Sequence, residues 1–375
     1  MPIPTLEKIK NPELVKGAIR EVYQLAGRVT DKLGRKPVLM EVCGTHTMTI
    51  SKSGLRGILK NVAELKSGPG CPVCVTSQED IDRLIEISRL EKVAIATFGD
   101  MIRVPGSRST LEKERGLGAT IKIIYSPLEA LSWAINNPDQ EVVLLGVGFE
   151  TTAPAVALCM SKAVNLGIKN FSVLSMHKTM PEVLKRLLKD KETMLDGLIL
   201  PGHVCAITGR KPFDFIADYG VSAAVSGFEP LDVLGAMKII LGQILEEKCE
   251  VANGYQRLVS ETGNEPALGL LKKYFVPGNG VWRGLGSVPN SGLNISLTYR
   301  SFDAAFRFPV EIPPIVSHAG CRCGELLKGK IEPSQCPLFG SKCIPKQPIG
   351  PCMVSSEGAC AAYYYFERNE EVPHE

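Results

Sequence analysis

Hydrophobic and polar positions alternate along the first two thirds of the chain in a way typical of an α/β protein. Residues 12–34 have the spacing of an amphipathic helix, which should end near Gly34. Short apolar runs then recur, separated by polar or helical stretches; they lie at 36–42, 92–99, 120–125 and 141–148, and in FSVLSM, DGLILPG and SAAVSG. Strands separated by helices predict parallel sheets that are covered by helices on both faces.

We therefore expect fold class α/β, with two doubly wound, Rossmann-like lobes. The predicted division places an N-terminal helix at 1–34, one lobe at 35–120 and a second lobe at 121–227. After about residue 260 the alternation stops, and glycine and proline become frequent. Residues 228–375 should accordingly form a helical and loop-rich C-terminal domain.

Unusual peptides follow several of the predicted strands. CGTH follows the run at 36–42, and the others are FGDMIRVPG, GFETTAP and PGHV. Ligands of parallel sheets bind at the carboxyl ends of the strands, so we expect these peptides to converge. Ser77 should cap a helix that begins at QEDIDRL, just after another unusual loop, SGPGCPVCVTS.

Composition and charge narrow the class of protein. The 375 residues have a formal charge of only +3 and no block of lysine and arginine, which argues against nucleic acid as a partner. No secretory signal is visible, and the apolar runs are too short to span a membrane. We expect a cytoplasmic protein, in which clustered cysteines act as metal ligands or reactive thiols more often than as structural disulfides.

Half of the twelve cysteines lie in the last fifty-five residues. This rear group consists of Cys321, Cys323, Cys336, Cys343, Cys352 and Cys360. Four thiolates can bind a [4Fe–4S] cluster or a zinc ion. No pair in the group has the two-residue gap of common zinc knuckles, and the wide spacing favours a cluster enclosed by loops. The alternative is a set of inert buried thiols.

Three further cysteines lie in glycine-rich turns near the N-terminus. Cys43 and His46 form CGTH, in which a thiolate and an imidazole could share a metal, although a single cysteine at a strand end is often inert. Cys71 and Cys74 form GPGCPVC, and Cys-x-x-Cys pairs cycle between dithiol and disulfide. The alternative for this pair is half of a structural zinc site.

Two other residues are candidates for acid–base chemistry. Glu150 in GFETT could transfer protons or bind a partner, but it could equally be an acid at the positive end of a helix. His203 in PGHV could act as an acid or base, or it could be a hydrogen-bonded structural histidine. No glycine-rich turn matches a phosphate-binding loop, so we expect no dedicated nucleotide site.

Taken together, these peptides resemble the HypD family of hydrogenase maturation proteins. The similarity spans roughly residues 40–360 and is carried by EVCGTHT, GPGCPVCVT, TFGDMIRVPG, GVGFETTAP, LPGHVCAITG and GCRCGELLKGKIEPSQCPLFGSKCIPKQPIGPCMVSSEGAC. The resemblance implies an assembly scaffold rather than a classical turnover enzyme. A small partner, HypC, would help to hold the Fe(II) that becomes the Fe(CN)2CO centre of [NiFe]-hydrogenases, and HypE would deliver the cyanide. The chain would be a monomer on its own.

The resemblance also implies roles for the cysteines. Cys43 matches the iron-binding thiol, with His46 beside it, and Cys71 and Cys74 match the thiol pair. The tail matches the [4Fe–4S] site, for which the favoured ligands are Cys323, Cys336, Cys343 and Cys360. The choices between Cys321 and Cys323 and between Cys352 and Cys360 stay open, as do the source of CO and the electron donor. The competing functions are a cluster-dependent thiol/disulfide oxidoreductase and a zinc-stabilised interaction module.

Overall fold

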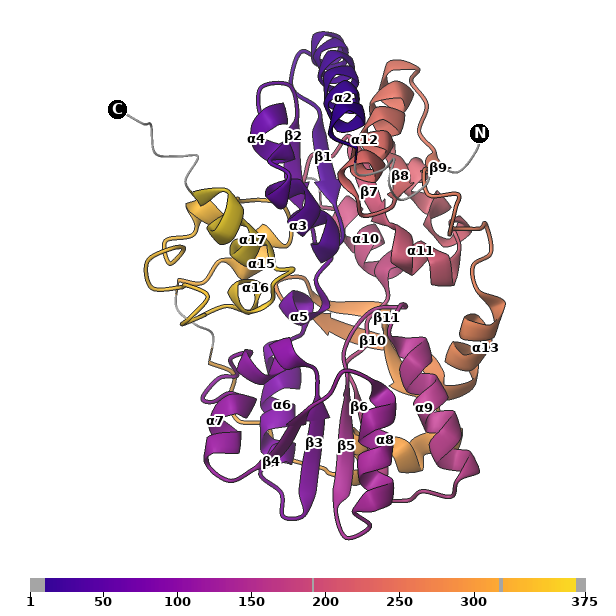
Figure 1. The fold of residues 1–375 in the computed structure, drawn as a ribbon, viewed down its shortest axis with the longest axis vertical. Helices are drawn as coiled ribbons and strands as arrows, with labels where there is room; N and C mark the ends of the chain where they lie inside the picture. The colour runs from indigo at the N-terminus through magenta and orange to yellow at the C-terminus, as the bar shows by residue number, and fades with distance from the viewer. Residues whose placement is uncertain (1–10, 191, 317–319, 369–375) are drawn as a thin grey trace.

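The computed structural model describes residues 11–190, 192–316 and 320–368, which form two α/β lobes and a C-terminal segment beside them (Figure 1). The first lobe contains a parallel sheet of five strands in the order β2 (Glu64–Ser67), β1 (Val38–Glu41), β7 (Gly197–Pro201), β8 (Ser222–Ser226) and β9 (Val251–Asn253). The second contains a parallel sheet of four strands in the order β4 (Thr120–Ile123), β3 (Val93–Thr97), β5 (Glu141–Gly146) and β6 (Phe171–Ser175).

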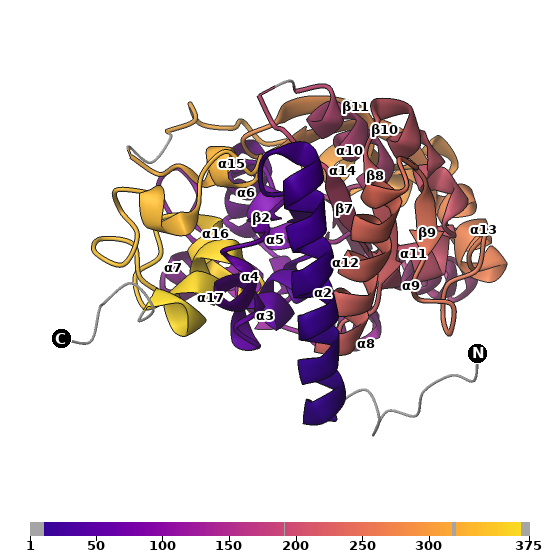
Figure 2. The same cartoon turned by 90° about the horizontal axis from the view of Figure 1, so that it is seen from above.

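Helices cover both faces of the first sheet. Alternate strand residues such as Leu39 and Met40 point into opposite cores. One core is closed by α2 (Pro12–Leu33) and α12 (Pro230–Leu245), which lie side by side (Figure 2). The helix α2 ends at Gly34, whose φ of 68° is the left-handed conformation expected of a helix stop. The other core is closed by α10 (Met180–Leu188), η2 (Lys211–Tyr219) and α11 (Gly202–Thr208).

The second sheet is covered in the same way. The helices α8 (Pro127–Asn136) and α9 (Ala153–Asn165) pack on one face, and α6 (Gln78–Ser88) and α7 (Leu111–Gly116) pack on the other. Ser77 caps α6 as predicted, because its Oγ accepts a hydrogen bond of 3.0 Å from the Asp80 N–H. The predicted fold class of two doubly wound lobes is therefore confirmed.

Strand pairing divides the chain differently from the predicted boundary at residue 120. The strand β3, expected in the first lobe, belongs to the second sheet, and β7 and β8, expected in the second lobe, belong to the first sheet beside β1. The helices α2 and α12 and the strand β9 also belong to the first lobe rather than to separate domains. Alternation along the sequence indicates how many strands exist, but neighbours in a sheet are set by contacts between distant segments.

The C-terminal third is less regular, as expected, but it contains a hairpin where only loops were predicted. The strands β10 (Phe275–Trp282) and β11 (Gly286–Ile295) pair in antiparallel fashion and lie between the two lobes (Figure 1). The remaining elements are α13 (Glu265–Tyr274), η3 (Leu297–Phe302), α14 (Ala304–Arg307), α15 (Cys323–Leu326), η4 (Pro333–Gln335), α16 (Pro351–Val354) and α17 (Ala359–Phe366).

Four short elements complete the first two thirds of the chain. They are α3 (Gly44–Lys52), α4 (Leu55–Leu59), α5 (Pro72–Val75) and η1 (Gly99–Arg103). The single turn α5 lies where the chain passes from the first lobe to the second (Figure 1). None of the helices in the described ranges combines the length and the apolar character that a membrane span requires.

Candidate functional site

The turn that carries Cys43 lies at the carboxyl end of β1, directly before α3. The backbone N–H of Cys43 donates a hydrogen bond of 3.1 Å to Glu41 Oε2, and Glu41 Oε1 accepts a further bond of 2.5 Å from the Thr47 hydroxyl. Burial raises the pKa of the Cys43 thiol to about 12. The backbone N–H groups of His46 and Thr45 favour the thiolate and lower the pKa, but their effect is smaller than that of burial. The turn therefore presents a neutral, fixed thiol at neutral pH.

The imidazole nearest to Cys43 is not the one suggested by the CGTH spacing. Both ring nitrogens of His203 lie 4.0 Å from Cys43 Sγ, because CGTH and PGHV follow the neighbouring parallel strands β1 and β7. His46 instead makes a bond of 2.8 Å to the Gly227 carbonyl. Both imidazole rings lie 4.9 Å from the ring of Phe228, and burial lowers the pKa of each to about 4.

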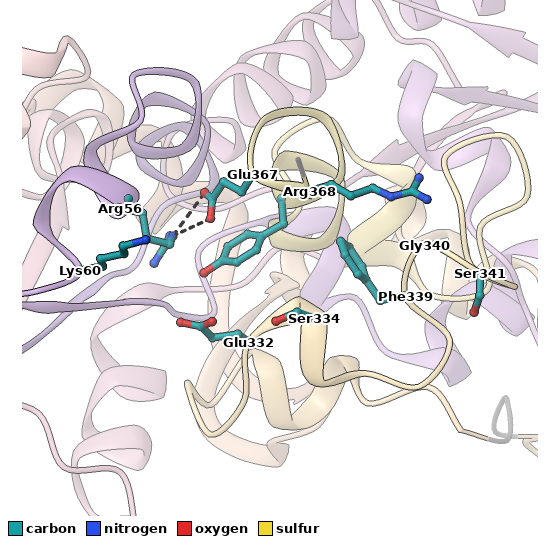
Figure 3. A pocket seen from close by; sticks show the side chains of 11 residues that line it. Arg56, Lys60, Glu332, Ser334, Phe339, Gly340, Ser341, Glu367 and Arg368 are labelled. Carbon is teal, nitrogen blue, oxygen red and sulfur yellow. Dashed lines mark hydrogen bonds and ion pairs between the residues drawn. The ribbon is translucent and has the colours of Figure 1, made fainter. Parts of the chain in front are cut away.

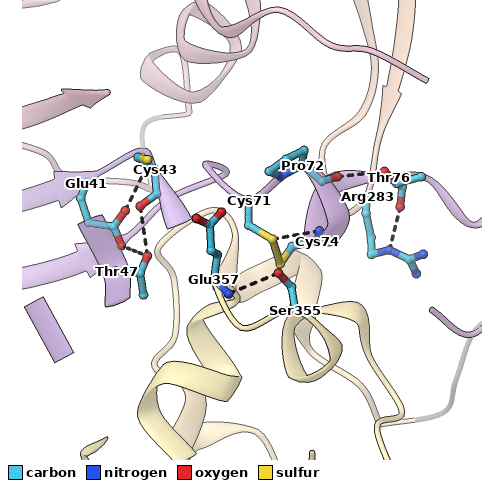
Figure 4. The surroundings of a disulfide bond; sticks show 10 residues. All are labelled: Glu41, Cys43, Thr47, Cys71, Pro72, Cys74, Thr76, Arg283, Ser355 and Glu357. Atoms are coloured by element: carbon cyan, nitrogen blue, oxygen red, sulfur yellow. Dashed lines mark hydrogen bonds between the residues drawn. A yellow bond between two sulfur atoms is a disulfide. The ribbon is translucent and has the colours of Figure 1, made fainter. Parts of the chain in front are cut away.

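Cys71 and Cys74 lie at either end of the first turn of α5 and are joined by a disulfide, one of the two states predicted for the pair. The Cys43 turn lies directly against this loop, since the Gly44 N–H donates to the Gly70 carbonyl at 3.1 Å (Figure 4). A Cβ atom at Gly44 would lie only 3.3 Å from Cys71 Cβ. The two N-terminal thiol motifs are thus in contact. Of the peptides expected to converge at strand ends, CGTH and PGHV follow neighbouring strands of one sheet, whereas FGDMIRVPG and GFETTAP follow strands of the other.

The rear cysteines also converge. Five of them, including all four favoured cluster ligands, line one small cavity; they are Cys321, Cys323, Cys336, Cys343 and Cys360. Cys321 Sγ and Cys323 Sγ are 3.3 Å apart. Cys352 is fully buried and interacts with the Cys323 and Cys360 side chains. The geometry therefore does not separate the favoured four from Cys321.

The surroundings of the rear cysteines suit a thiolate-bound group. Across residues 11–190, 192–316 and 320–368, no three Cys, His, Asp or Glu side chains already surround one point as metal ligands. The donors nevertheless are thiols, and the Ile349 N–H points at Cys343 Sγ at 3.3 Å. A Cβ at Gly350 would come within 2.6 Å of Cys323 Sγ and 2.8 Å of Cys321 Sγ, so only glycine leaves this space free. Sulfur donors, an amide N–H and a glycine cradle fit an iron–sulfur cluster.

The rear and front thiols share one packing unit. The helix α16, which carries Cys352, packs on α5, and α17, which begins near Cys360, packs on α3. Glu357 lies between these two helices in the sequence and close to the disulfide (Figure 4). Its Oε1 accepts a bond of 2.7 Å from the Thr45 hydroxyl. Motifs separated by nearly three hundred residues of sequence are therefore in contact.

Glu150 occupies a different part of the molecule. Glu150 Oε1 accepts a hydrogen bond of 2.9 Å from the Met180 N–H at the start of α10. Glu150 is therefore an acid at the N-terminus of a helix, which was the structural alternative in the prediction. The helix is α10, however, and not the helix that follows Glu150 in the sequence. Burial raises the pKa of this carboxyl to about 7. Its Oε2 has no hydrogen-bond partner among the described residues. The Cys205 thiol lies within its electrostatic range.

A cavity of about 640 Å³ between α4 and the C-terminal residues was not predicted (Figure 3). Arg56, which is largely buried, forms an ion pair of 3.3 Å with Glu367, hydrogen-bonds the Leu65 carbonyl and lies 4.8 Å above the Tyr363 ring. Lys60 and Arg368 also line the space. None of the predicted site residues lines this cavity. The ion pair of Arg56 with Glu367 joins the rear segment to the first lobe there.

Comparison with known proteins agrees with the resemblance seen in the motifs. The family model HypD, described as "Hydrogenase formation hypA family", matches residues 15–367. The hydrogenase maturation factor HypD of Rhodobacter capsulatus is 42% identical over 366 residues, which cover 96% of this chain and 97% of that protein. The factor of the same name from Azotobacter vinelandii is 41% identical, and the alignment covers 93% of this chain and 95% of that protein. The factor from Escherichia coli (strain K12) is 38% identical, with 97% of this chain and 98% of that protein covered. The chain belongs to the HypD family.

Proposed function

We propose that this protein is a hydrogenase maturation factor, and that it serves as the scaffold on which the iron of a [NiFe]-hydrogenase acquires cyanide and CO. The observation that supports this proposal is the contact between the Cys43 turn, the Cys71–Cys74 loop and the helices that carry the rear cysteines. A lone metal site or a lone redox pair would not require all three groups in one place.

Cys43 is the thiol that would bind the substrate Fe(II). Soft thiolate donors suit the low-spin Fe(II) that cyanide and CO stabilise. Because burial keeps the thiol protonated, binding of the metal must release a proton. The neutral His203 ring, 4.0 Å from Sγ, is a candidate acceptor for this proton.

The Cys71–Cys74 pair would supply electrons for cyanide delivery. A thiocyanate carrier, R–S–CN, reacts with two thiols to give R–SH, HCN and a disulfide, so that the carbon–sulfur bond breaks as the new sulfur–sulfur bond forms. The cyanide then binds iron and its proton leaves. A disulfide between Cys71 and Cys74, the state in which the pair is found, would be the oxidised product of that step, and two electrons and two protons would restore the dithiol.

The rear group would restore the dithiol. A [4Fe–4S] cluster, when bound, stores and releases single electrons. The proposed ligands remain Cys323, Cys336, Cys343 and Cys360. The chain contributes the contact of α16 with α5, which shortens the distance that electrons must cover to reach the pair.

Access explains the need for protein partners. Cys43 is only 2% exposed, so iron and cyanide must enter through a rearrangement or a fitted partner surface. A HypC-type protein would share the iron, and a HypE-type protein would carry the cyanide. Gly44 and Gly70 lack side chains, which lets the Cys43 turn and the Cys71–Cys74 loop pack tightly against each other and against Glu357.

The decisive experiment is infrared spectroscopy of the chain co-purified anaerobically with a HypC-type partner. We expect bands in the CN and CO stretching region that disappear in Cys43→Ala. The matched control is Cys249→Ala, since Cys249 is an exposed thiol outside the three groups and its loss should leave the bands unchanged. Bands that persist in Cys43→Ala would contradict the proposal.

The second candidate is a cluster-dependent thiol/disulfide oxidoreductase. The observation that favours it is the disulfide of α5 in contact with the helix that carries Cys352. It predicts reduction of a generic disulfide substrate without partners, abolished in Cys71→Ala and retained in Cys43→Ala. Metal analysis separates both candidates from a zinc-stabilised module, which would contain zinc and no iron.

A further inference from the structure

A third loop at the carboxyl edge of the first sheet belongs to the surroundings of Cys43. The strand β7 lies between β1 and β8, so the segments that follow these three parallel strands are neighbours. The first segment carries Cys43, and the second carries His203. The third is the loop 227–229, which leads from β8 into α12 and carries Phe228. A site built on Cys43 and His203 is therefore bordered by Phe228.

The ring of Phe228 packs against two imidazoles. The His46 ring lies 4.9 Å from it with an angle of 28° between the planes, and the His203 ring lies 4.9 Å from it with an angle of 33°. His46 belongs to α3, the helix that begins directly after Cys43. Both ring nitrogens of His203 lie 4.0 Å from Cys43 Sγ. The three rings thus form a continuous packed series from the helix after Cys43 back to its sulfur.

No hydrogen bond sets the orientation of the His203 ring. His46 makes a bond of 2.8 Å to the Gly227 carbonyl, which fixes its own ring. In the described parts of the chain, the ring nitrogens of His203 have no polar partner besides the Cys43 thiol at 4.0 Å. Functional imidazoles are normally oriented by a hydrogen bond to the second ring nitrogen. For His203 this task falls to packing, and the aromatic ring that packs on it is Phe228.

Phe228 is itself held from several directions. Its carbonyl accepts a bond of 2.7 Å from the Thr49 hydroxyl of α3, and its ring meets the ring of Tyr255 edge to face at 6.3 Å. Tyr255 lies close against the backbone, because a Cβ at Gly202 or at Gly227 would come within 2.6 or 2.5 Å of its ring. The loop cannot shift without disturbing these contacts, so the Phe228 ring is a fixed surface for His203.

We propose that Phe228 positions the His203 ring against the Cys43 sulfur and so shapes the wall of the site at which iron would bind. Phe228 is accordingly a positioning residue, which acts on Cys43 through His203. That imidazole is the candidate acceptor of the thiol proton: as Fe(II) binds, the S–H bond breaks, an N–H bond forms on His203, and the freed electron pair of sulfur binds the metal. His46, which the CGTH spacing suggested as a metal partner, acts through Phe228 instead.

The inference rests on the proposed function for the iron step but not for the positioning, so the first test is made without iron on the full, reduced chain. Nuclear Overhauser cross-peaks between the ring protons of His203 and the Hβ protons of Cys43 report their proximity, with histidine and cysteine protonated in an otherwise deuterated chain. Phe228→Leu keeps an apolar side chain but removes the flat ring, and it should lose these cross-peaks. Phe228→Tyr keeps the ring and should retain them. The matched control is Phe215→Leu, which alters a partly buried phenylalanine of the same lobe and should also retain them.

The second test measures the CN and CO bands of the chain co-purified anaerobically with a HypC-type partner after a fixed time of expression. Displacement of a reacting group by about 1 Å can slow a reaction on the order of a hundredfold. We therefore expect Phe228→Leu to lower the band intensity about tenfold, whereas Phe228→Tyr and Phe215→Leu should stay within about twofold of wild type.

A folded Phe228→Leu protein that keeps the cross-peaks would overturn the proposal. Where Phe228→Leu does not fold, Phe228→Met supplies a flexible side chain without a flat face, and a folded Phe228→Met protein with wild-type cross-peaks would overturn it equally. Loss of the cross-peaks with unchanged bands would overturn the role of this position in iron binding. Failure of the proposed function is distinguishable, because wild type would then lack the bands and still show the cross-peaks.

Discussion

The buried carboxyl of Glu150 predicts an unusual dependence of stability on pH. Its pKa in the folded protein is raised by burial to about 7, from an ordinary value of 4.5. Between these two values the folded state binds more protons than the unfolded state, so its contribution to stability is present at low pH and is lost as the pH rises toward 7. Worked from these two values, the loss between pH 5 and pH 8 is about 2–3 kcal/mol.

The assay compares wild type with Glu150→Gln, which mimics the protonated carboxyl and does not titrate. Urea unfolding is followed by tryptophan fluorescence in a Trp133→Phe background, so that the one remaining tryptophan of two, Trp282, is the reporter. Trp282 is suitable because its ring stacks on Phe149, beside Glu150, at 5.9 Å. We expect the free energy of unfolding of Glu150→Gln relative to wild type to rise by about 2–3 kcal/mol from pH 5 to pH 8.

The matched control is Glu182→Gln, which removes a surface carboxylate in the first turn of the same α10. Its ion pair with Lys185 is solvent-exposed, and such pairs contribute about 0–1 kcal/mol. A relative stability of Glu150→Gln that changes by less than about 0.5 kcal/mol over this pH range would refute the reasoning, because it would mean that the Glu150 carboxyl titrates as it does in water.

Two further perturbations test how the elements around the site are joined. Gly44→Ala places a Cβ 2.7 Å from Glu357 Cβ, so we expect thermal unfolding to show a loss of about 1–3 kcal/mol in the free energy of unfolding. The control Gly17→Ala lies in open space on α2 and should raise the free energy of unfolding by about 0.5–1 kcal/mol. Equal effects of the two substitutions would contradict the close approach. Arg35→Ala removes a bidentate ion pair with Asp196, with two hydrogen bonds of 2.7 Å, that links the end of α2 to the start of β7. We expect urea unfolding to show a loss of about 1 kcal/mol in the free energy of unfolding. An unchanged free energy of unfolding would show that the pair is solvated.

The sequence predicted the local elements better than their assembly. The helix over 12–34, its stop at Gly34 and the cap at Ser77 depend on neighbours within a few residues, and the structure contains all three. The division at residue 120 depends on which strands pair, and β1 pairs with β7 although about 150 residues, including all of the second sheet, lie between them in the sequence. No local pattern carries that information, since both sheets are built from equally apolar strands.

The candidate site was predictable to the extent that its residues have distinctive chemistry. Cysteine motifs and strand-end turns drew attention to Cys43, Cys71 and His203, which the structure brings together. The spacing of CGTH pointed to His46 as the partner of Cys43, but a helix begins at Gly44 and directs that ring toward Gly227. Glu357 carried no signal, because a glutamate in a loop is ordinary until folding places it beside Thr45.

The placement of the rear cysteines has a consequence for the order of assembly. The short helices that carry Cys352 and Cys360 have little regular structure of their own to stabilise them, and they pack directly on α5 and α3. A group bound by the rear thiols would stabilise those helices, and the bond from Thr45 to Glu357 would transmit that order to the Cys43 turn. If iron binds at Cys43 as proposed, loading of the rear site should therefore precede it, because α17 packs on α3, the helix that begins directly after Cys43.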